Sequence, residues 1–218
     1  MEFVATLTPI IIAYLLGGIP FGLLIARLYG VPDIRQEGSG NIGATNVWRV
    51  AGPKAAVWVY LLDIGKGVAA VLIAHQFTPV LVSKDVLLIV CAVVAVAGNL
   101  FPVYLRFRGG KGVNTSLGVM ITLLPLETLI CLTVFLVVVV ISRFISLGSL
   151  LAAICLPGVV LVEKFLLNRE VADIYLYLTV LVALLVILSH RQNIGRLLTG
   201  KENRFSFPSN TNRVGSHV

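Results

Sequence analysis

One stretch of the sequence concentrates hydrogen-bonding groups in an otherwise apolar chain. Residues 38–49 contain three glycines, several hydroxyl and amide side chains and an arginine, and no acidic residue. Glycines let backbone N–H groups approach an oxyanion closely, and an arginine adds a permanent charge with a fork geometry suited to phosphate. The stretch predicts an anion site, although glycine, serine and asparagine are also ordinary residues of a flexible connector. Its candidate binding residues are Gly38, Ser39, Gly40, Asn41, Gly43, Thr45, Asn46 and Arg49.

A second glycine-rich segment lies directly before a long apolar run that begins at Val113. Free N–H groups at a helix start, glycines and a lysine together favour anion binding. The segment is not a Walker A loop, since its first glycine, its spacing and the residue after its lysine do not fit that pattern. The alternative is a basic loop that only sets membrane topology. The candidates are Gly109, Gly110, Lys111 and Gly112.

Two more polar segments border the last apolar runs. His190 and Asn193 are three residues apart and can share one helix face, but a histidine at a helix end is often only a cap. The hydroxyls of the earlier segment could equally cap the helix that follows it. Its candidates are Ser142, Arg143, Ser146 and Ser149.

Asp63 and Lys66 lie within an apolar run and are also three residues apart. Ionisable side chains inside a membrane span are costly to bury, which makes them functional candidates by default. A structural ion pair beside the site is the alternative, because the two can meet on one helix face.

Apolar runs must position these segments. They cover about 6–28, 54–76, 85–101, 113–141, 144–165 and 172–190, and each is long enough to cross a membrane. The run 113–141 is longer than one crossing needs and contains Pro125, so we expect two short helices there, with a single kinked helix as the alternative. The predicted fold is therefore all-α, a polytopic integral membrane protein with about seven transmembrane helices, two of them short.

The basic residues predict the orientation of the chain. Of its 17 lysines and arginines, Lys66 lies inside a predicted span and only Lys84, Lys164 and Arg169 fall on the side of the amino terminus. The positive-inside rule then places the amino terminus outside and the carboxyl terminus in the cytoplasm. With seven helices, all four polar segments meet at the cytoplasmic face. We expect one transmembrane domain over 1–200 and a polar, disordered cytoplasmic tail over 201–218.

The composition narrows the possible functions. The chain of 218 residues is 58% hydrophobic and 12% charged, which is typical of polytopic membrane proteins. Its net charge of +7 comes from short loops rather than one basic face, so no nucleic-acid partner is expected. The three cysteines lie in apolar runs without metal or redox spacing, and no cofactor or metal is expected.

The four segments, in this order, resemble the bacterial acyl-phosphate:glycerol-3-phosphate acyltransferases, the PlsY family. The first matching part contains the motifs Gly-Ser-Gly-Asn at 38–41 and Ala-Thr-Asn at 44–46, followed by Arg49. The second contains Gly98, Phe101-Pro102 and the Gly-Gly-Lys-Gly segment at 109–112. The match continues with Ser-Leu-Gly-Ser at 146–149 and ends with His190, Arg191 and Asn193-Ile194. The chain departs from the family at Asn99, where a histidine is usual, although asparagine can keep a hydrogen bond.

The resemblance implies transfer of a fatty acyl group from acyl phosphate to the 1-hydroxyl of glycerol 3-phosphate, without a covalent acyl-enzyme. It assigns Lys111, Arg49, Ser149, His190 and Asn193 to glycerol phosphate. It assigns Ser39, Asn41, Thr45, Asn46 and the 109–112 backbone to the acyl phosphate or its oxyanion. The general base is either His190 or a substrate phosphate.

Several further expectations accompany this resemblance. The partners are the two substrates and membrane lipid, the protein is expected to be a monomer, and the location is the bacterial plasma membrane. A small carrier of an organic anion or phosphate is the alternative function, because membrane spans with internal charge and proline breaks also occur in transporters. A carrier should place its binding groups near the middle of the membrane rather than in loops on one side.

Overall fold

The computed structural model describes residues 2–205, and these form ten α-helices and two short 3-10 helices without a strand. The tail residues 206–218, for which disorder was predicted, lie outside the described part. The α-helices are α1 (Glu2–Gly18), α2 (Phe21–Leu28), α3 (Ala44–Ala51), α4 (Pro53–His75), α5 (Lys84–Leu100), α6 (Val113–Leu123), α7 (Pro125–Ser142), α8 (Ile145–Phe165), α9 (Asp173–Ser189) and α10 (Arg191–Leu198).

The apolar helices follow the predicted order along the chain. Five segments are long and apolar enough to cross a membrane, namely Phe3–Leu28, Pro53–His75, Lys84–Leu105, Pro125–Ser142 and Ile145–Phe165. A sixth forms if α9 is joined to α10 across a bend of 61°, and α6 is a shorter apolar helix. These findings confirm the all-helical polytopic fold. Two short helices were expected in the run 113–141, but only α6, with 11 residues, is short there, because α7 is 18 residues long.

The run 113–141 divides into two helices, as predicted. Leu124 leaves the helical conformation, and Pro125 opens α7 at its first position. Proline suits that position because its missing N–H would have no partner in the first turn, whereas inside a helix it removes a hydrogen bond. The alternative of a single kinked helix is therefore wrong. The division reverses the chain and lets α7 pack on α8.

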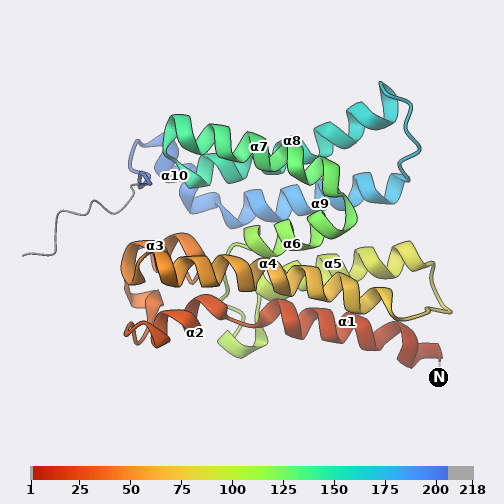
Figure 1. Ribbon diagram of the computed structural model, residues 1–218, viewed down its shortest axis with the longest axis horizontal. Coiled ribbons are helices and arrows are strands. Elements are labelled where there is room, and N and C mark those ends of the chain that lie inside the picture. The colour runs from red at the N-terminus through yellow and green to blue at the C-terminus, as the bar shows by residue number, and fades with distance from the viewer. Residues whose placement is uncertain (1, 206–218) are drawn as a thin grey trace, which may run out of the picture.

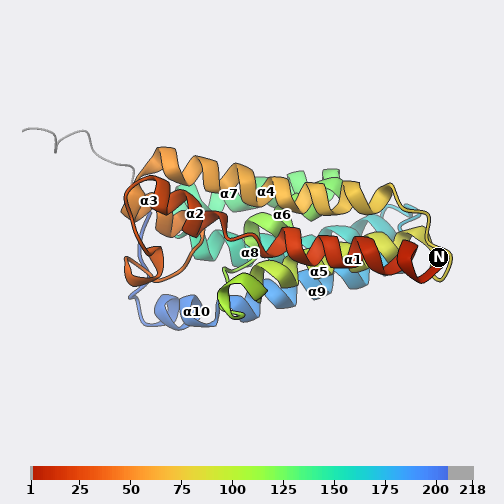
Figure 2. The same ribbon diagram turned by 90° about the horizontal axis from the view of Figure 1, so that it is seen from below.

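The helices lie roughly along one long axis, and the polar segments gather at one end (Figures 1 and 2). The amino terminus of α1 lies at the opposite end from α3 and α10. Helix α1 packs against α5, α4 against α6, and α8 against both α7 and α9. This arrangement brings segments from both halves of the sequence to the same end of the bundle.

Glycines allow two of these helix pairs to approach closely. A Cβ on Gly118 of α6 would lie 2.1 Å from the backbone oxygen of Ile64 on α4. Gly67 of α4 lies at the same crossing of these two helices. A Cβ on Gly17 of α1 would lie 2.0 Å from the backbone oxygen of Ala95 on α5. Small residues at membrane helix crossings are expected, because close backbone packing replaces a hydrophobic driving force there.

Asp63 and Lys66 form a buried ion pair on α4, with 2.7 Å between Asp63 Oδ1 and Lys66 Nζ. Lys66 Nζ also donates a hydrogen bond of 2.9 Å to the carbonyl of Ile19, which lies in the break between α1 and α2. The Phe21 N–H donates to the same carbonyl at 3.0 Å, so the lysine adds a second hydrogen bond at the break. The pair therefore has a structural role, holding the break against α4.

Candidate functional site

The loop before α3 is folded around the side chain of Asn46. Asn46 Oδ1 accepts a hydrogen bond of 2.8 Å from the Ser39 N–H, and Nδ2 donates to the carbonyls of Ile34, Glu37 and Asn41. The residue is 2% exposed. Because its amide is fully used inside the loop, Asn46 shapes the predicted anion site rather than presenting its amide to a ligand.

Glycines fix the path of this loop. Gly38 and Gly40 have φ of 58° and 70°, a region that favours glycine. A Cβ on Gly38 would also lie 2.3 Å from Asn46 Oδ1. The Gly43 N–H donates to Asn41 Oδ1 at 2.8 Å, and α3 then begins at Ala44, so that its first turn faces the pocket described below.

The second glycine segment is attached to the end of α5 through Asn99. The Gly110 N–H donates to the Asn99 carbonyl at 3.0 Å, and the Gly112 N–H donates to Asn99 Oδ1 at 2.9 Å. A Cβ on Gly109 would lie only 2.0 Å from the same carbonyl. Asn99 thus keeps a hydrogen bond at the position where the family usually has histidine. Helix α6 starts at Val113 without a side-chain cap, and its N-terminus borders the pocket.

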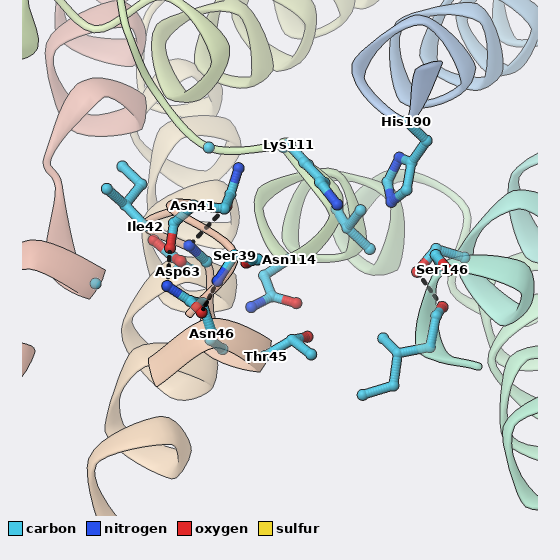
Figure 3. Close-up of a pocket in the computed structure, with 18 of the residues that line it drawn as sticks. Ser39, Asn41, Ile42, Thr45, Asn46, Asp63, Lys111, Asn114, Ser146 and His190 are labelled. Atoms are coloured by element: carbon cyan, nitrogen blue, oxygen red, sulfur yellow. Dashed lines mark hydrogen bonds between the residues drawn. The ribbon is translucent and has the colours of Figure 1, made fainter. Parts of the chain in front are cut away.

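Residues after α9 complete the opposite wall. Lys111 Nζ donates to Asn193 Oδ1, and Ser189 Oγ donates to the Lys111 carbonyl at 3.1 Å. The Nδ1 atom of His190 lies 2.8 Å from the Val186 carbonyl, which requires the proton on Nδ1. Nε2 is then the unprotonated nitrogen of the ring. Figure 3 shows Lys111 and His190 pointing into the same space, with Ser39, Asn41 and Thr45 on one side and Ser146 on the other.

Glu202 belongs to this site, although it was not among the residues predicted for it. Its Oε1 accepts hydrogen bonds from Ser146 Oγ at 2.8 Å and Asn193 Nδ2 at 2.6 Å, and its Oε2 accepts one from Arg196 Nε at 2.7 Å. Burial would raise the pKa of Glu202, but these hydrogen bonds outweigh it and lower the pKa. The carboxylate joins α8 to α10. It lies in a polar segment beyond Gly200, where no pattern distinguishes it from a solvated charge.

The described residues enclose a polar pocket of about 120 Å³ at the end of the bundle that holds α3 and α10. Most of the predicted site residues line it, from all four polar segments. They are Ser39, Asn41, Gly43, Thr45, Asn46, Arg49, Gly110, Lys111, Gly112, Ser146, Ser149, His190 and Asn193. Further polar residues that line it were not among the candidates, and they include Tyr60, Asn99, Asn114, Arg196, Glu202 and Asn203. Asp63 also lines the pocket.

Five predicted site residues do not line the pocket, and each has another role. Gly38 and Gly40 set the turn of the first loop, and Gly109 lets the second loop lie on α5. Ser142 Oγ donates to the Val138 carbonyl at 2.7 Å, and Arg143 ends α7 with φ of 61°. The last two residues therefore form the turn between α7 and α8. Helix α8 has no side-chain cap, so the alternative that these hydroxyls cap it is wrong.

Burial changes the proton affinity of two side chains in the pocket. It lowers the pKa of Lys111 to about 8, partly opposed by the Glu202 carboxylate. It also lowers the pKa of His190, which follows α9, to about 4, and the nearby Lys111 charge acts in the same direction. At neutral pH the lysine is mostly cationic and the imidazole is neutral, so the pocket can bind an anion and also accept a hydrogen bond.

Comparison with known proteins gives one consistent result. Residues 7–200 match the family model described as glycerol-3-phosphate acyltransferase. The glycerol-3-phosphate acyltransferase of Desulforamulus reducens is 44% identical over 202 residues, covering 93% of this chain and 96% of the relative. That of Syntrophotalea carbinolica is 45% identical over 193 residues, covering 88% and 94%.

Solved structures agree with this match. One is the crystal structure of PlsY (YgiH), an integral membrane glycerol 3-phosphate acyltransferase, in its glycerol 3-phosphate form. It is 40% identical to this chain with a TM-score of 0.80, and the match covers 92% of this chain and 96% of that one. The lysophosphatidic acid form has a TM-score of 0.78 and 39% identity, covering 92% and 95%. Because the matches extend over nearly the whole chain, this protein belongs to the glycerol-3-phosphate acyltransferase family.

Proposed function

We propose that the protein transfers an acyl group from acyl phosphate to the 1-hydroxyl of glycerol 3-phosphate. The observation that carries this proposal is a pocket with the cationic side chains Lys111 and Arg49, and Arg196 paired with Glu202, next to glycine N–H groups and the start of α6. Two phosphate-bearing molecules repel one another, so a site that joins them needs positive charge and N–H donors on several sides. The relatives' name and the two PlsY forms support the acceptor and the product.

Lys111, Arg49 and Ser149 would bind the phosphate of glycerol phosphate, with Asn193 and His190 placing its glycerol part. Lys111 is fixed by Asn193. Because both substrates are bound before bonds change, much of the rate gain comes from holding the hydroxyl against the carbonyl carbon.

The donor phosphate and the developing oxyanion would lie at Ser39, Asn41, Thr45 and the 110–112 backbone. Asn46 keeps the first loop in shape, and Asn99 does so for the second. Preorganised N–H donors stabilise a tetrahedral oxyanion without a cost of reorganisation during the reaction.

The transfer needs no acyl-enzyme, because acyl phosphate is a mixed anhydride that already carries a good leaving group. The glycerol hydroxyl oxygen forms a bond to the carbonyl carbon, the bond from that carbon to the phosphate oxygen breaks, and the hydroxyl proton leaves. The products are lysophosphatidic acid and inorganic phosphate.

We assign His190 to orienting the hydroxyl, with its proton passing to a substrate phosphate. Nε2 can accept a hydrogen bond from that hydroxyl, since Nδ1 donates to the Val186 carbonyl. A base with a pKa of about 4 is poorly matched to neutral pH, whereas a phosphate ester has a second pKa of about 6.

Replacing His190 tests this assignment. His190→Gln should keep at least about a tenth of the wild-type kcat, because a glutamine oxygen can accept a hydrogen bond near the place of Nε2, while His190→Ala should lose on the order of a hundredfold. The measurement is steady-state phosphate release at saturating substrates. Equal losses in the two variants would mean that the imidazole itself takes the proton.

The charge of Lys111 predicts how the reaction depends on pH. Its lowered pKa of about 8 means that the free enzyme loses the cation as pH rises through 8, so kcat/KM for glycerol 3-phosphate should fall there, about tenfold per pH unit above the pKa. Lys111→Arg should remove this alkaline limb, because arginine stays protonated. An unchanged limb in that variant would assign the titration to another group.

The acyl chain would lie in an apolar cavity that joins the polar pocket through residues shared by both, Tyr60, Val113, Asn114, Phe135 and Ser149. It is bounded by α4, α6, α7, α8 and α9. Acyl carbon and phosphate would then sit where polar and apolar walls meet.

We also propose the bacterial plasma membrane as the location, with the amino terminus outside and the pocket in the cytoplasm. The pocket and the basic loops lie at the end opposite the amino terminus, and the positive-inside rule places such loops in the cytoplasm. One chain supplies all the residues assigned here, so a monomer suffices.

The direct test uses purified protein in lipid, palmitoyl phosphate and radiolabelled glycerol 3-phosphate. Equal amounts of lysophosphatidic acid and inorganic phosphate are expected. Uptake of glycerol phosphate into sealed vesicles without product would support the carrier instead. A burst of phosphate release in the absence of the acceptor, together with acylated protein, would overturn direct transfer.

A further inference from the structure

The apolar cavity beside the pocket has a definite direction. Its volume is about 340 Å³, and its walls are almost wholly apolar. The cavity starts at the polar pocket and runs along three helices. Its lining extends on α6 from Val113 to Met120 and on α8 from Ser149 to Leu156. On α7, which runs in the opposite direction, it extends from Phe135 to Thr128. Each of these stretches advances seven positions, which corresponds to about 10 Å at 1.5 Å per helical residue. The three helices therefore agree on where the cavity starts and where it ends along the long axis of the bundle.

The end of the cavity away from the polar pocket is closed. Met120, Thr128 and Leu156 are 2%, 4% and 6% exposed, so these side chains are covered from behind. Glu127 and Glu163, two buried carboxyl residues, lie further along α7 and α8, and Glu163 forms an ion pair of 3.0 Å with Arg169. An alkyl chain that extended past the closed end would have to displace packed side chains or enter this polar layer, and neither is favourable.

The opening to lipid lies along the side of the cavity. Ile64 on α4, Leu117 on α6 and Leu132 on α7 line the cavity and are only half-buried. Helix α4 packs on α6, and α7 packs on α8. The side of the cavity that faces the space between α4 and α7 is therefore less covered by protein than the far end of the cavity. A chain can enter sideways from the bilayer and still meet the closed end with its methyl group.

We propose that Met120, Thr128 and Leu156 set the length of acyl chain that the enzyme transfers best. This inference rests on the proposed function and adds to it the determinants of donor selectivity. A chain that just reaches the closed end buries all its methylenes in the cavity. A longer chain must bend out through the side opening, and a shorter one leaves cavity volume unfilled, at a cost of about fourfold in affinity per methylene not buried.

Two substitutions at different depths test the proposal. Met120→Trp fills the far end of the cavity, and Ala153→Leu fills it nearer the polar pocket, since Ala153 lies between Ser149 and Leu156 on α8. Ile121→Trp is the matched control, because the neighbouring Ile121 is 44% exposed and does not line the cavity. The measurement is kcat/KM for hexanoyl, decanoyl and palmitoyl phosphate, with monodispersity and thermal unfolding as the check on folding.

We expect Met120→Trp to lower the ratio of kcat/KM for decanoyl over hexanoyl phosphate by at least about tenfold, which corresponds to two methylenes displaced from the far end of the cavity. Ala153→Leu should lower it further, and Ile121→Trp should leave it unchanged. Folded Met120 and Ala153 variants with the wild-type ratio would overturn the proposal and place the chain in the side opening. If the wild-type protein turns over no acyl phosphate, the proposed function fails instead, so the two failures are distinguishable.

Discussion

Lys111→Ala is expected to lower kcat/KM for glycerol 3-phosphate by on the order of a thousandfold, with kcat falling as well as KM rising. Lys111 joins the second glycine segment to the opposite wall, through its hydrogen bond to Asn193 and the hydrogen bond that its carbonyl accepts from Ser189. Removing it deletes charge where two phosphates and an oxyanion would meet. The measurement is initial-rate phosphate release over a matrix of both substrate concentrations.

The control for Lys111 is Lys54→Ala, which removes the same charge at the same end of the bundle. Lys54 is exposed in the first turn of α4 and does not line the pocket. Its variant should keep activity within about twofold, because exposed charges contribute little locally. Near-normal turnover by a folded Lys111→Ala variant would remove that lysine from the mechanism.

Gly22→Ala is expected to reduce kcat/KM by about a hundredfold or more, although the glycine carries no functional group. A Cβ at this position of α2 would lie 1.6 Å from the backbone oxygen of Ile42, so the loop that carries Asn41 and Gly43 must move. A displacement of about 1 Å in a positioned substrate can cost a hundredfold in rate. Activity and thermal unfolding of the same preparation should be measured.

Gly65→Ala on α4 is the matched control for this variant. A Cβ at Gly65 meets nothing within 4 Å, and the position is exposed. Alanine has the higher helix propensity, so stability should stay equal or rise slightly and activity should not change. Wild-type kinetics for Gly22→Ala would show that the Ile42 loop moves without disturbing the site.

Local features of the sequence were sufficient for the outline of the fold and much of the site. The lengths of the apolar runs fix the helices, and Pro125 fixes the division between α6 and α7, because a proline ends a helix through its own backbone. The composition of the two glycine-rich segments is sufficient to predict that they bind an anion. They converge because helices of membrane length alternate in direction, which depends only on the number of spans.

Tertiary structure alone decided the roles of individual side chains. The sequence determined which segments are polar and at which end they lie, but the inward amide of Asn46, the bond from Ser142 back to its own helix and the return of Glu202 to α8 and α10 appear only in the folded chain. The closed end of the apolar cavity likewise depends on three different helices. The physical reason is that hydrophobic length is a property of consecutive residues, whereas a hydrogen-bond partner or a cavity wall is supplied by residues distant in sequence.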